Sequence, residues 1–168
     1  NLTSVNLTGT DLTGSDLTGA TLSNNTFSAT TNLTSATLTD VAGLAGRDMT
    51  GVDLEKADLR GADLSLTDLE DAILIGANLT DGAAKTDLTG ATLTNAKLSK
   101  ADLTGADLST NTVPTVNVKT NLVGADLTGA ILIGANLSDA ILVDDTVGSK
   151  GANLEKADLT GANLSDTV

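Results

Sequence analysis

Leucine recurs every five residues along almost the whole chain, and this period constrains the fold more than any other feature. The first run reads Leu2, Leu7, Leu12, Leu17 and Leu22. Continued through five shifts of register, the pattern gives 33 five-residue units, of which 27 have Leu at the centre. A period of five fits neither an α-helix, which needs apolar residues three and four apart, nor a long strand, which needs strict alternation. It indicates one short structural unit repeated many times.

Polar and apolar positions alternate within each unit. The residue two before the centre is usually Ala, the one before it is Asp or Asn, and the one after it is Thr or Ser. Ala and Leu therefore point inwards while the residues flanking Leu point outwards, as in a short strand. Of the 17 glycines, 13 lie two residues after the centre, where freedom to adopt a positive φ marks a corner. A chain that repeats this strand and this corner without reversing its direction winds into stacked coils. The sequence therefore predicts a parallel β-solenoid around a column of Leu and Ala.

These units resemble those of the pentapeptide-repeat family, which read Ala, Asp or Asn, Leu and two variable residues. Three stretches match in full: 57–61, 101–105 and 125–129. The resemblance covers nearly the whole chain and implies an all-β fold, a right-handed quadrilateral parallel β-helix with four pentapeptides per coil. About eight coils would then form a single domain over residues 1–168, a rod ~40 Å long at a strand spacing of ~4.8 Å.

Composition excludes most enzyme chemistry. The chain has no His and no Cys, so it has no imidazole base, no thiolate and no Cys or His metal ligand. A filled solenoid also lacks the cleft in which two carboxylates could have different pKa values. We therefore expect no enzyme activity and no cofactor.

Charge and hydropathy limit the partners. The 22 acidic and 9 basic residues give a net charge of -13, which disfavours nucleic acid and anionic membranes. No apolar run approaches the roughly 20 residues that span a bilayer. The sequence predicts a soluble protein, either cytoplasmic or exported with a signal peptide removed upstream of Asn1. An unknown protein, or a second copy of this chain, is the expected partner.

Register shifts interrupt the repeat at five places: 28–32, 39–43, 84–87, 119–121 and 148–153. Extra residues in a coil must bulge outwards. Each shift is either a harmless irregularity at a corner or a loop that marks a partner surface. The least typical stretch is 113–118, because Pro114 cannot donate a hydrogen bond to a strand ladder.

A row of aspartates is the first candidate site. With four units per coil and the shifts absorbed at corners, five aspartates are expected to stack on one face: Asp48, Asp68, Asp87, Asp107 and Asp126. Like carboxylates ~4.8 Å apart repel one another, so such an acidic ladder could attract a divalent cation or a basic partner. The alternative is a solvated face whose carboxylates accept hydrogen bonds from nearby backbone amides.

Two isoleucine pairs form the second candidate site. Elsewhere the outward positions are mostly polar, but Ile73 and Ile75 flank Leu74, and Ile131 and Ile133 flank Leu132. The same coil arithmetic places both pairs on one face, as an apolar strip suited to a partner. The alternative is that these β-branched residues only favour the strand conformation.

Two functions follow from these features. The first is a non-enzymatic acidic scaffold or protein-interaction module. The second comes from the resemblance: some pentapeptide-repeat proteins mimic DNA, bind DNA gyrase and confer quinolone resistance. Duplex DNA carries one charge per ~1.7 Å, or roughly 23 charges over ~40 Å. A net charge of -13 is about half of that, so the scaffold function is preferred.

Overall fold

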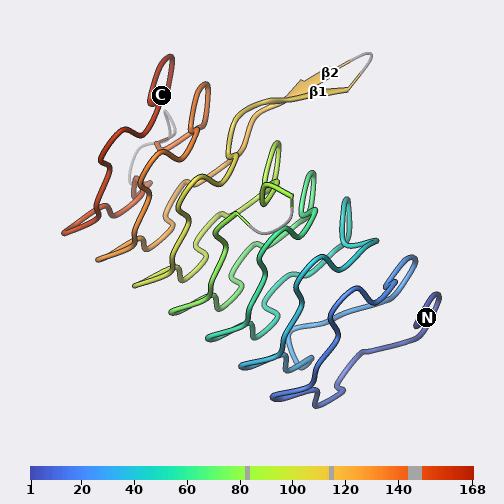
Figure 1. Ribbon diagram of the computed structural model, residues 1–168. Coiled ribbons are helices and arrows are strands. Elements are labelled where there is room, and N and C mark those ends of the chain that lie inside the picture. The colour runs from blue at the N-terminus through green and yellow to red at the C-terminus, as the bar shows by residue number, and fades with distance from the viewer. Residues whose placement is uncertain (82–83, 114–115, 144–148) are drawn as a thin grey trace.

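The computed structural model describes residues 1–81, 84–113, 116–143 and 149–168. The chain winds in one direction through stacked coils from its N-terminus to its C-terminus (Figure 1), which confirms the expected right-handed quadrilateral parallel β-helix. The described residues contain no α-helix, and hence no helix long and apolar enough to cross a membrane. Two named strands, β1 (Asn111–Val113) and β2 (Val116–Val118), form an antiparallel hairpin that projects from the coils.

Single-residue parallel bridges join successive coils, except between Thr26 and Asp48 and between Ala42 and Asp63. The bridged residue is the one that precedes the central Leu or its equivalent, and these residues define four faces. In chain order, face 1 carries Asn6, Thr26, Asp48, Asp68, Thr92, Asn121 and Ile141. Face 2 carries Asp11, Asn32, Asp53, Ile73, Lys97, Asp126 and Asn153. Face 3 carries Asp16, Thr37, Asp58, Asn78, Asp102, Ile131 and Asp158. Face 4 carries Thr21, Ala42, Asp63, Asp87, Asp107, Asn136 and Asn163.

The unit of five has a simple structural cause. The amide of nearly every central Leu donates to a carbonyl of the next coil, as from Leu98 to Asp126 at 2.7 Å. The chain then turns, and the amide of the following inward residue donates back to the same Leu, as from Ala106 to Leu103 at 3.0 Å. The residue between takes a positive φ, which is 71° at Gly105. One extended triplet and one left-handed corner therefore use five residues.

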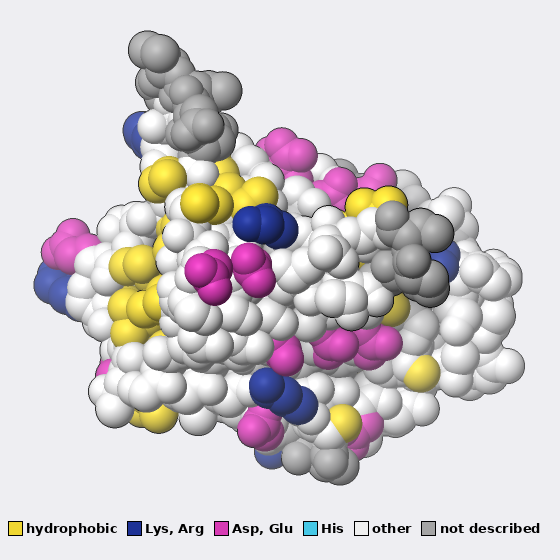
Figure 2. Space-filling view, turned by 90° about the horizontal axis from the view of Figure 1, so that it is seen from above, with side chains coloured by type: hydrophobic (Ala, Val, Ile, Leu, Met, Phe, Trp, Pro, Cys, Tyr) yellow, Lys and Arg dark blue, Asp and Glu magenta, His cyan; other side chains and the backbone are white. Residues whose placement is uncertain are grey.

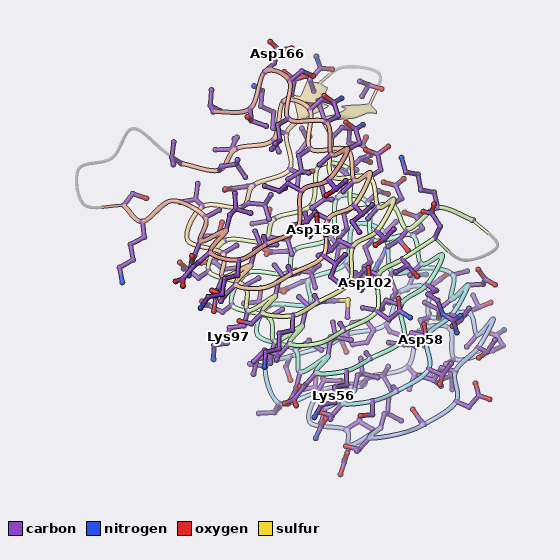
Figure 3. The ribbon with its side chains drawn as sticks, turned by 60° about the vertical axis from the view of Figure 1, so that its left-hand side comes forward. Lys56, Asp58, Lys97, Asp102, Asp158 and Asp166 are labelled. Carbon is purple, nitrogen blue, oxygen red and sulfur yellow. The ribbon has the colours of Figure 1, made fainter. Side chains whose placement is uncertain are left out.

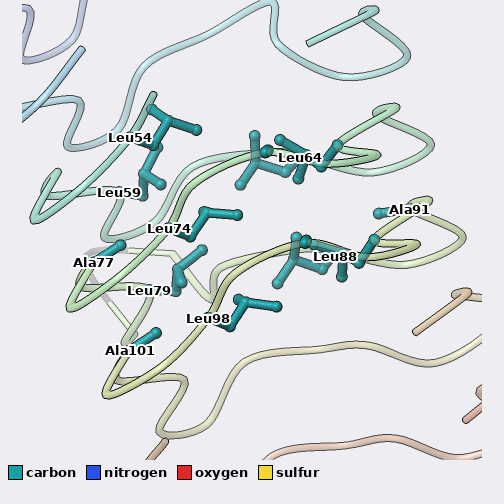
Figure 4. Packing of buried hydrophobic residues seen from close by; sticks show 14 of the residues in the cluster. Leu54, Leu59, Leu64, Leu74, Ala77, Leu79, Leu88, Ala91, Leu98 and Ala101 are labelled. Atoms are coloured by element: carbon teal, nitrogen blue, oxygen red, sulfur yellow. The ribbon is translucent and has the colours of Figure 1, made fainter. Parts of the chain in front are cut away.

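The core is the predicted column of Leu and Ala. Leucines of successive coils, such as Leu54, Leu74 and Leu98, follow one another along the inside of the helix (Figure 4). Leucines in the middle of the rod, such as Leu54 and Leu98, have no solvent exposure, whereas Leu12 and Leu154 near its two ends are only partly buried. Fully burying one Leu side chain contributes about 1.5–3 kcal/mol, so the column is the main source of stability.

The coils differ in length, and this corrects the register. Successive positions on face 2 are 20 residues apart between Asp53 and Ile73, but 29 apart between Lys97 and Asp126. Three positions assigned to the wall by the five-residue count lie outside it: Ala84 is exposed, and Val113 and Val118 belong to the projecting hairpin. Ala84 and residues 110–113 and 116–119 therefore leave the wall, and the units between 87 and 143 lie on other faces than the count gave them.

Candidate protein-binding surface

Asp and Asn precede the central Leu for a local reason. Their side-chain oxygen accepts a hydrogen bond from the amide two residues later, as Asp126 does from Thr128 at 3.0 Å. The same contact recurs on all four faces, with Asn121 accepting from Val123 and Asp63 from Ser65. The outward carboxylates are therefore turn-forming groups that repeat with the coil.

Hydroxyl groups reinforce several of these turns and lower the pKa of the carboxyl group. The Thr128 hydroxyl donates to Asp126 at 2.6 Å and the Ser99 hydroxyl donates at 2.8 Å, and these contacts hold the pKa of Asp126 below its ordinary value. The Arg60 guanidinium contacts both carboxylate oxygens of Asp58, at 2.8 and 2.6 Å, and lowers the pKa of Asp58. Hydrogen bonds that favour the charged form account for both shifts.

The predicted acidic ladder does not lie on one face. Asp48 pairs with Asp68 on face 1, Asp87 pairs with Asp107 on face 4, and Asp126 lies on face 2. The count was wrong because Ala84 lies outside the wall, so Asp87 takes the place on face 4 that the count gave to Ala84; Val113 and Val118 also lie outside it, which moves Asp126 to face 2. No group of three or more acidic side chains within the described residues is arranged to hold a metal ion.

A shorter acidic row exists on face 4, where Asp63, Asp87 and Asp107 bridge consecutively. Lys85 lies 3.4 Å from Asp107, and the Asn136 side-chain amide donates to Asp107 at 3.1 Å. The row therefore ends in a neutral amide after three coils. Aspartates on face 3 are interrupted in the same way: Figure 3 shows Asp58, Asp102 and Asp158 along one side of the rod, and Asn78 and Ile131 stand between them in the row.

The predicted isoleucine strip is also divided. Ile73 lies on face 2 and Ile131 on face 3. Ile75 and Ile133 belong to the same units and therefore lie on the same faces as their partners. Ala84, Val113 and Val118 were all counted as wall positions, and these three extra units between Ile73 and Ile131 explain the difference. Ile73 and Ile75 are half-buried, whereas Ile131 and Ile133 are 37% and 40% exposed. Only the second pair presents substantial apolar surface.

A different apolar surface lies beside the hairpin. The chain leaves β2, passes through Lys119 and Thr120 and enters face 1, where Val123 lies below Val143 on the next coil. The side chains of Val116 and Val143 are 58% and 51% exposed. We call Val116, Ile141 and Val143, together with Val123, which is itself buried at 8% exposed, the hairpin surface. In the view of Figure 2, hydrophobic side chains gather over the C-terminal half of the rod.

Local contacts fix this surface in place. Lys119 lies 3.8 Å from the Asp139 carboxylate at the foot of the hairpin. Gly151 approaches Val143 so closely that an added Cβ would lie 2.6 Å from Val143 Cγ1. The sequence signal for the surface was the apolar residues in outward positions at 123, 141 and 143, which the search for paired isoleucines missed.

Buried threonines lie in the coils where the regular repeat is interrupted. Thr31, Thr86 and Thr120 occupy inward positions that elsewhere hold Ala, and all three have no solvent exposure. The Thr31 hydroxyl donates to the Leu7 carbonyl at 2.8 Å, and the Thr86 hydroxyl donates to the Thr80 carbonyl at 2.8 Å. Each hydroxyl satisfies a backbone group where the regular ladder is interrupted.

The model of pentapeptide repeats matches the chain in 8 copies, over residues 1–41, 48–81, 83–109, 118–144 and 150–168. This chain belongs to the pentapeptide repeat family. Within that family pattern, two unmatched stretches are structurally distinctive: 110–117 contains the hairpin, and 42–47 forms an irregular corner between faces 4 and 1.

Several solved pentapeptide repeat proteins are similar to this chain. HetL, involved in heterocyst differentiation regulation in the cyanobacterium Nostoc, is 31% identical, with 99% of this chain and 88% of HetL covered and a TM-score of 0.40. A thylakoid-lumen protein of Arabidopsis thaliana is 29% identical, with 73% and 72% covered and a TM-score of 0.43.

QnrB1, a plasmid-mediated fluoroquinolone resistance protein, is 20% identical, with 99% of this chain and 83% of QnrB1 covered and a TM-score of 0.58. This likeness shows a shared pentapeptide repeat fold. None of the curated protein sequences matches the chain.

Proposed function

We propose that this pentapeptide repeat protein is a non-enzymatic scaffold that binds another protein through its hairpin surface. The observation that carries the proposal is the position of exposed apolar groups. Before Val116, the only large hydrophobic side chain exposed among the described residues is Val5. After it come Ile131, Ile133, Val143, Leu164 and Val168, so exposed apolar groups gather on the hairpin and on the coils that follow it.

The rest of the surface supports a passive role. The outward carboxylates accept hydrogen bonds from turn amides and hydroxyls, so they already have partners within the rod. The leucine column runs from Leu2 to Leu159, in keeping with residues 1–168 acting as one domain. A rigid rod with one projecting hairpin is suited to holding a partner in a fixed orientation.

The test compares two double variants in pull-downs from the source cells. Val116→Ser with Val143→Ser removes the two most exposed apolar groups of the hairpin surface. Ile131→Thr with Ile133→Thr is the matched control, because it removes a similar apolar area from face 3. The proposal expects the same proteins to be retained by the wild type and the control and lost by the first variant. Equal retention by all three would contradict it.

The gyrase-directed alternative has one observation in its favour, the row of Asp63, Asp87 and Asp107 at strand spacing. The row spans ~10 Å before it reaches Asn136, and duplex DNA carries about six charges over that length. We therefore expect no inhibition of gyrase supercoiling at low-micromolar protein. Inhibition that weakens with added salt would reverse the preference, because screening by salt identifies attraction between exposed charges.

A further inference from the structure

From the third coil onwards, one corner of the rod carries a lysine on every second coil. The corner joins face 2 to face 3, and its residues have positive φ: Lys56, Gly76, Lys100, Gly129 and Lys156. Backbone hydrogen bonds link the corner from coil to coil, as from the Lys56 amide to the Ile75 carbonyl at 2.9 Å. Successive lysines are two coils apart and therefore lie ~9.6 Å apart along the rod.

A column of aspartates runs beside these lysines. Each corner lysine is followed two residues later by an aspartate of face 3, and the three aspartates are Asp58, Asp102 and Asp158. They follow one another along the rod in Figure 3. On the coils between them, the face 3 position holds uncharged Asn78 or Ile131. Three coils thus present a positive and a negative column at the same heights. We call the three lysines and three aspartates the Lys–Asp edge.

One sequence repeat produces this edge. Lys-Ala-Asp-Leu occurs three times in the chain, in segments 54–64, 98–108 and 154–164, and nowhere else. The glycines of the intervening coils leave room for the lysine stems. A Cβ at Gly76 would lie 3.7 Å from Lys56 Cγ, which is ordinary van der Waals contact. The alternation of lysine and glycine therefore lets each lysine lie along the corner without crowding the next one.

The charges of the edge are accessible. The side chains of Lys56 and Lys156 are 66% and 77% exposed, and each pairs with the glutamate before it, at 2.7 and 3.1 Å. Lys100 is also exposed. Within the described residues, neither Lys100 nor Asp102 belongs to an ion pair, and Asp102 accepts hydrogen bonds only from Thr104 of its own turn. The central coil of the edge therefore has a cation and an anion that a partner can pair.

We infer that the Lys–Asp edge binds a second copy of this chain, with the two rods side by side and pointing in the same direction. A two-fold axis parallel to the rods exchanges left and right, so each lysine column faces the aspartate column of the other copy on all three coils. A second copy turned upside down would place lysine against lysine. On the coil of Lys56 the match extends outwards, because Glu55 of one copy faces Arg60 of the other.

This interface is independent of the proposed function. The Lys–Asp edge lies between faces 2 and 3, whereas the hairpin surface lies at face 1. Loss of the partner bound at the hairpin surface would leave dimer formation unchanged, and loss of the dimer would leave that partner bound.

Sedimentation equilibrium of the full chain tests the interface. At 0.15 M salt a Debye length of about 8 Å screens repulsion between distant charges of the two acidic rods more than attraction between charges in contact. We expect a reversible dimer at sub-millimolar protein. Lys56→Asp with Lys100→Asp should raise the dissociation constant at least about tenfold. The matched control, Lys85→Asp with Lys150→Asp, makes the same change in net charge elsewhere and should dimerise like the wild type. A monomeric wild type, or equal weakening by both variants, would overturn the proposal.

An exchange of charges separates a lost interface from a damaged rod. Asp58→Lys with Asp102→Lys makes the edge basic, and Lys97 already occupies the equivalent position on face 2. This variant should be monomeric alone but form heterodimers when mixed with the Lys56→Asp and Lys100→Asp variant, because an acidic edge then meets a basic one. Absence of heterodimers from two folded variants would overturn the proposal.

Single cysteines test the orientation with less change to the rod. The chain has no Cys, so an introduced thiol can only pair with one on another molecule. A mixture of the Lys100→Cys and Asp102→Cys proteins should form disulfide-linked dimers faster than either protein alone. If Lys100→Cys alone is the fastest, the rods pair in opposite directions and the parallel interface is wrong.

Discussion

Thr120 and Gly90 lie on consecutive coils, and the Thr120 hydroxyl oxygen accepts a hydrogen bond from the Gly90 amide at 2.9 Å. The same oxygen lies 3.0 Å from the carbonyl oxygens of Leu88 and Ser109, either of which can accept its proton. Ser109 precedes the hairpin and Thr120 follows it. This single hydroxyl therefore joins the two ends of the projecting segment to the coil below and keeps the buried backbone groups satisfied.

Removal of this hydroxyl is expected to destabilise the rod. Thr120→Val keeps the shape but leaves the Gly90 amide with only its 3.1 Å contact to Ser109, at an expected cost of about 1–3 kcal/mol in the free energy of unfolding. Thr120→Ser should retain most of the stability. Thr94→Val, at an outward position, is the control. Urea unfolding measures all three, and a Thr120→Val variant as stable as the control would contradict the prediction.

Glycine corners differ in how much space surrounds them. Gly90 and Gly134 both have positive φ, at 67° and 65°. A Cβ at Gly90 would lie 2.8 Å from Asn111 Cβ and 2.9 Å from the Val118 carbonyl oxygen, whereas a Cβ at Gly134 would meet nothing within 4 Å.

Gly134→Ala should therefore cost only the strain of a left-handed Ala, about 1–2 kcal/mol. Gly90→Ala should cost more than that, because the returning hairpin must also move. Thermal denaturation of the two variants compares the costs directly. Equal losses would show that the hairpin base yields freely.

The repeat made most of the fold predictable. The period of five, the outward Asp at positions such as Asp102 and the inward Leu at positions such as Leu103 are local properties, repeated often enough to average out exceptions. Each unit needs the same triplet and corner, so the sequence pattern and the structure have the same period.

The faces of the candidate residues were not predictable by counting, because inserted residues leave the coil without changing the local pattern. Ala84 fits the apolar position of a unit, yet it is exposed. A partial signal was present: Thr86 and Thr120 lie where the chain returns to the wall, although Thr67 also replaces an inward Ala within a regular unit. The period alone cannot distinguish a wall unit from an outward loop, and one misassigned unit rotates every later residue to another face.

Acid should weaken the turn at Asp126. Its folded-state pKa is below the ordinary value of 3.8, so its contribution is complete above that value and is lost as the pH falls through the lower folded pKa. Solvent screening at this surface limits the contribution to roughly 0.5 kcal/mol. Asp126→Asn keeps an oxygen for the Thr128 amide but does not titrate. Urea unfolding at pH 7 and pH 3 should show a larger loss for the wild type than for Asp126→Asn, and equal losses would contradict this assignment.

A charge inside the leucine column should disrupt the coils next to it. Leu103 has no solvent exposure and lies between Leu79 and Leu132 on successive coils of face 3. Leu103→Asp places a carboxylate where no cation or amide is available, at an expected cost of several kcal/mol. Because each coil of a solenoid contacts only its neighbours, the damage should begin locally. Thr94→Asp adds the same charge at an outward position and should have little effect.

Hydrogen exchange of the Leu103→Asp variant would show where the damage lies. The Leu79 and Leu103 amides, which donate to the carbonyls of Asp102 and Ile131, should lose protection first, and the distant Leu17 amide should lose it last. A melting temperature equal to that of Thr94→Asp would show that position 103 tolerates charge, and the column would not be the source of stability. Uniform loss of protection along the whole chain would instead mean that the coils unfold as one cooperative unit, against the nearest-neighbour behaviour expected of a solenoid.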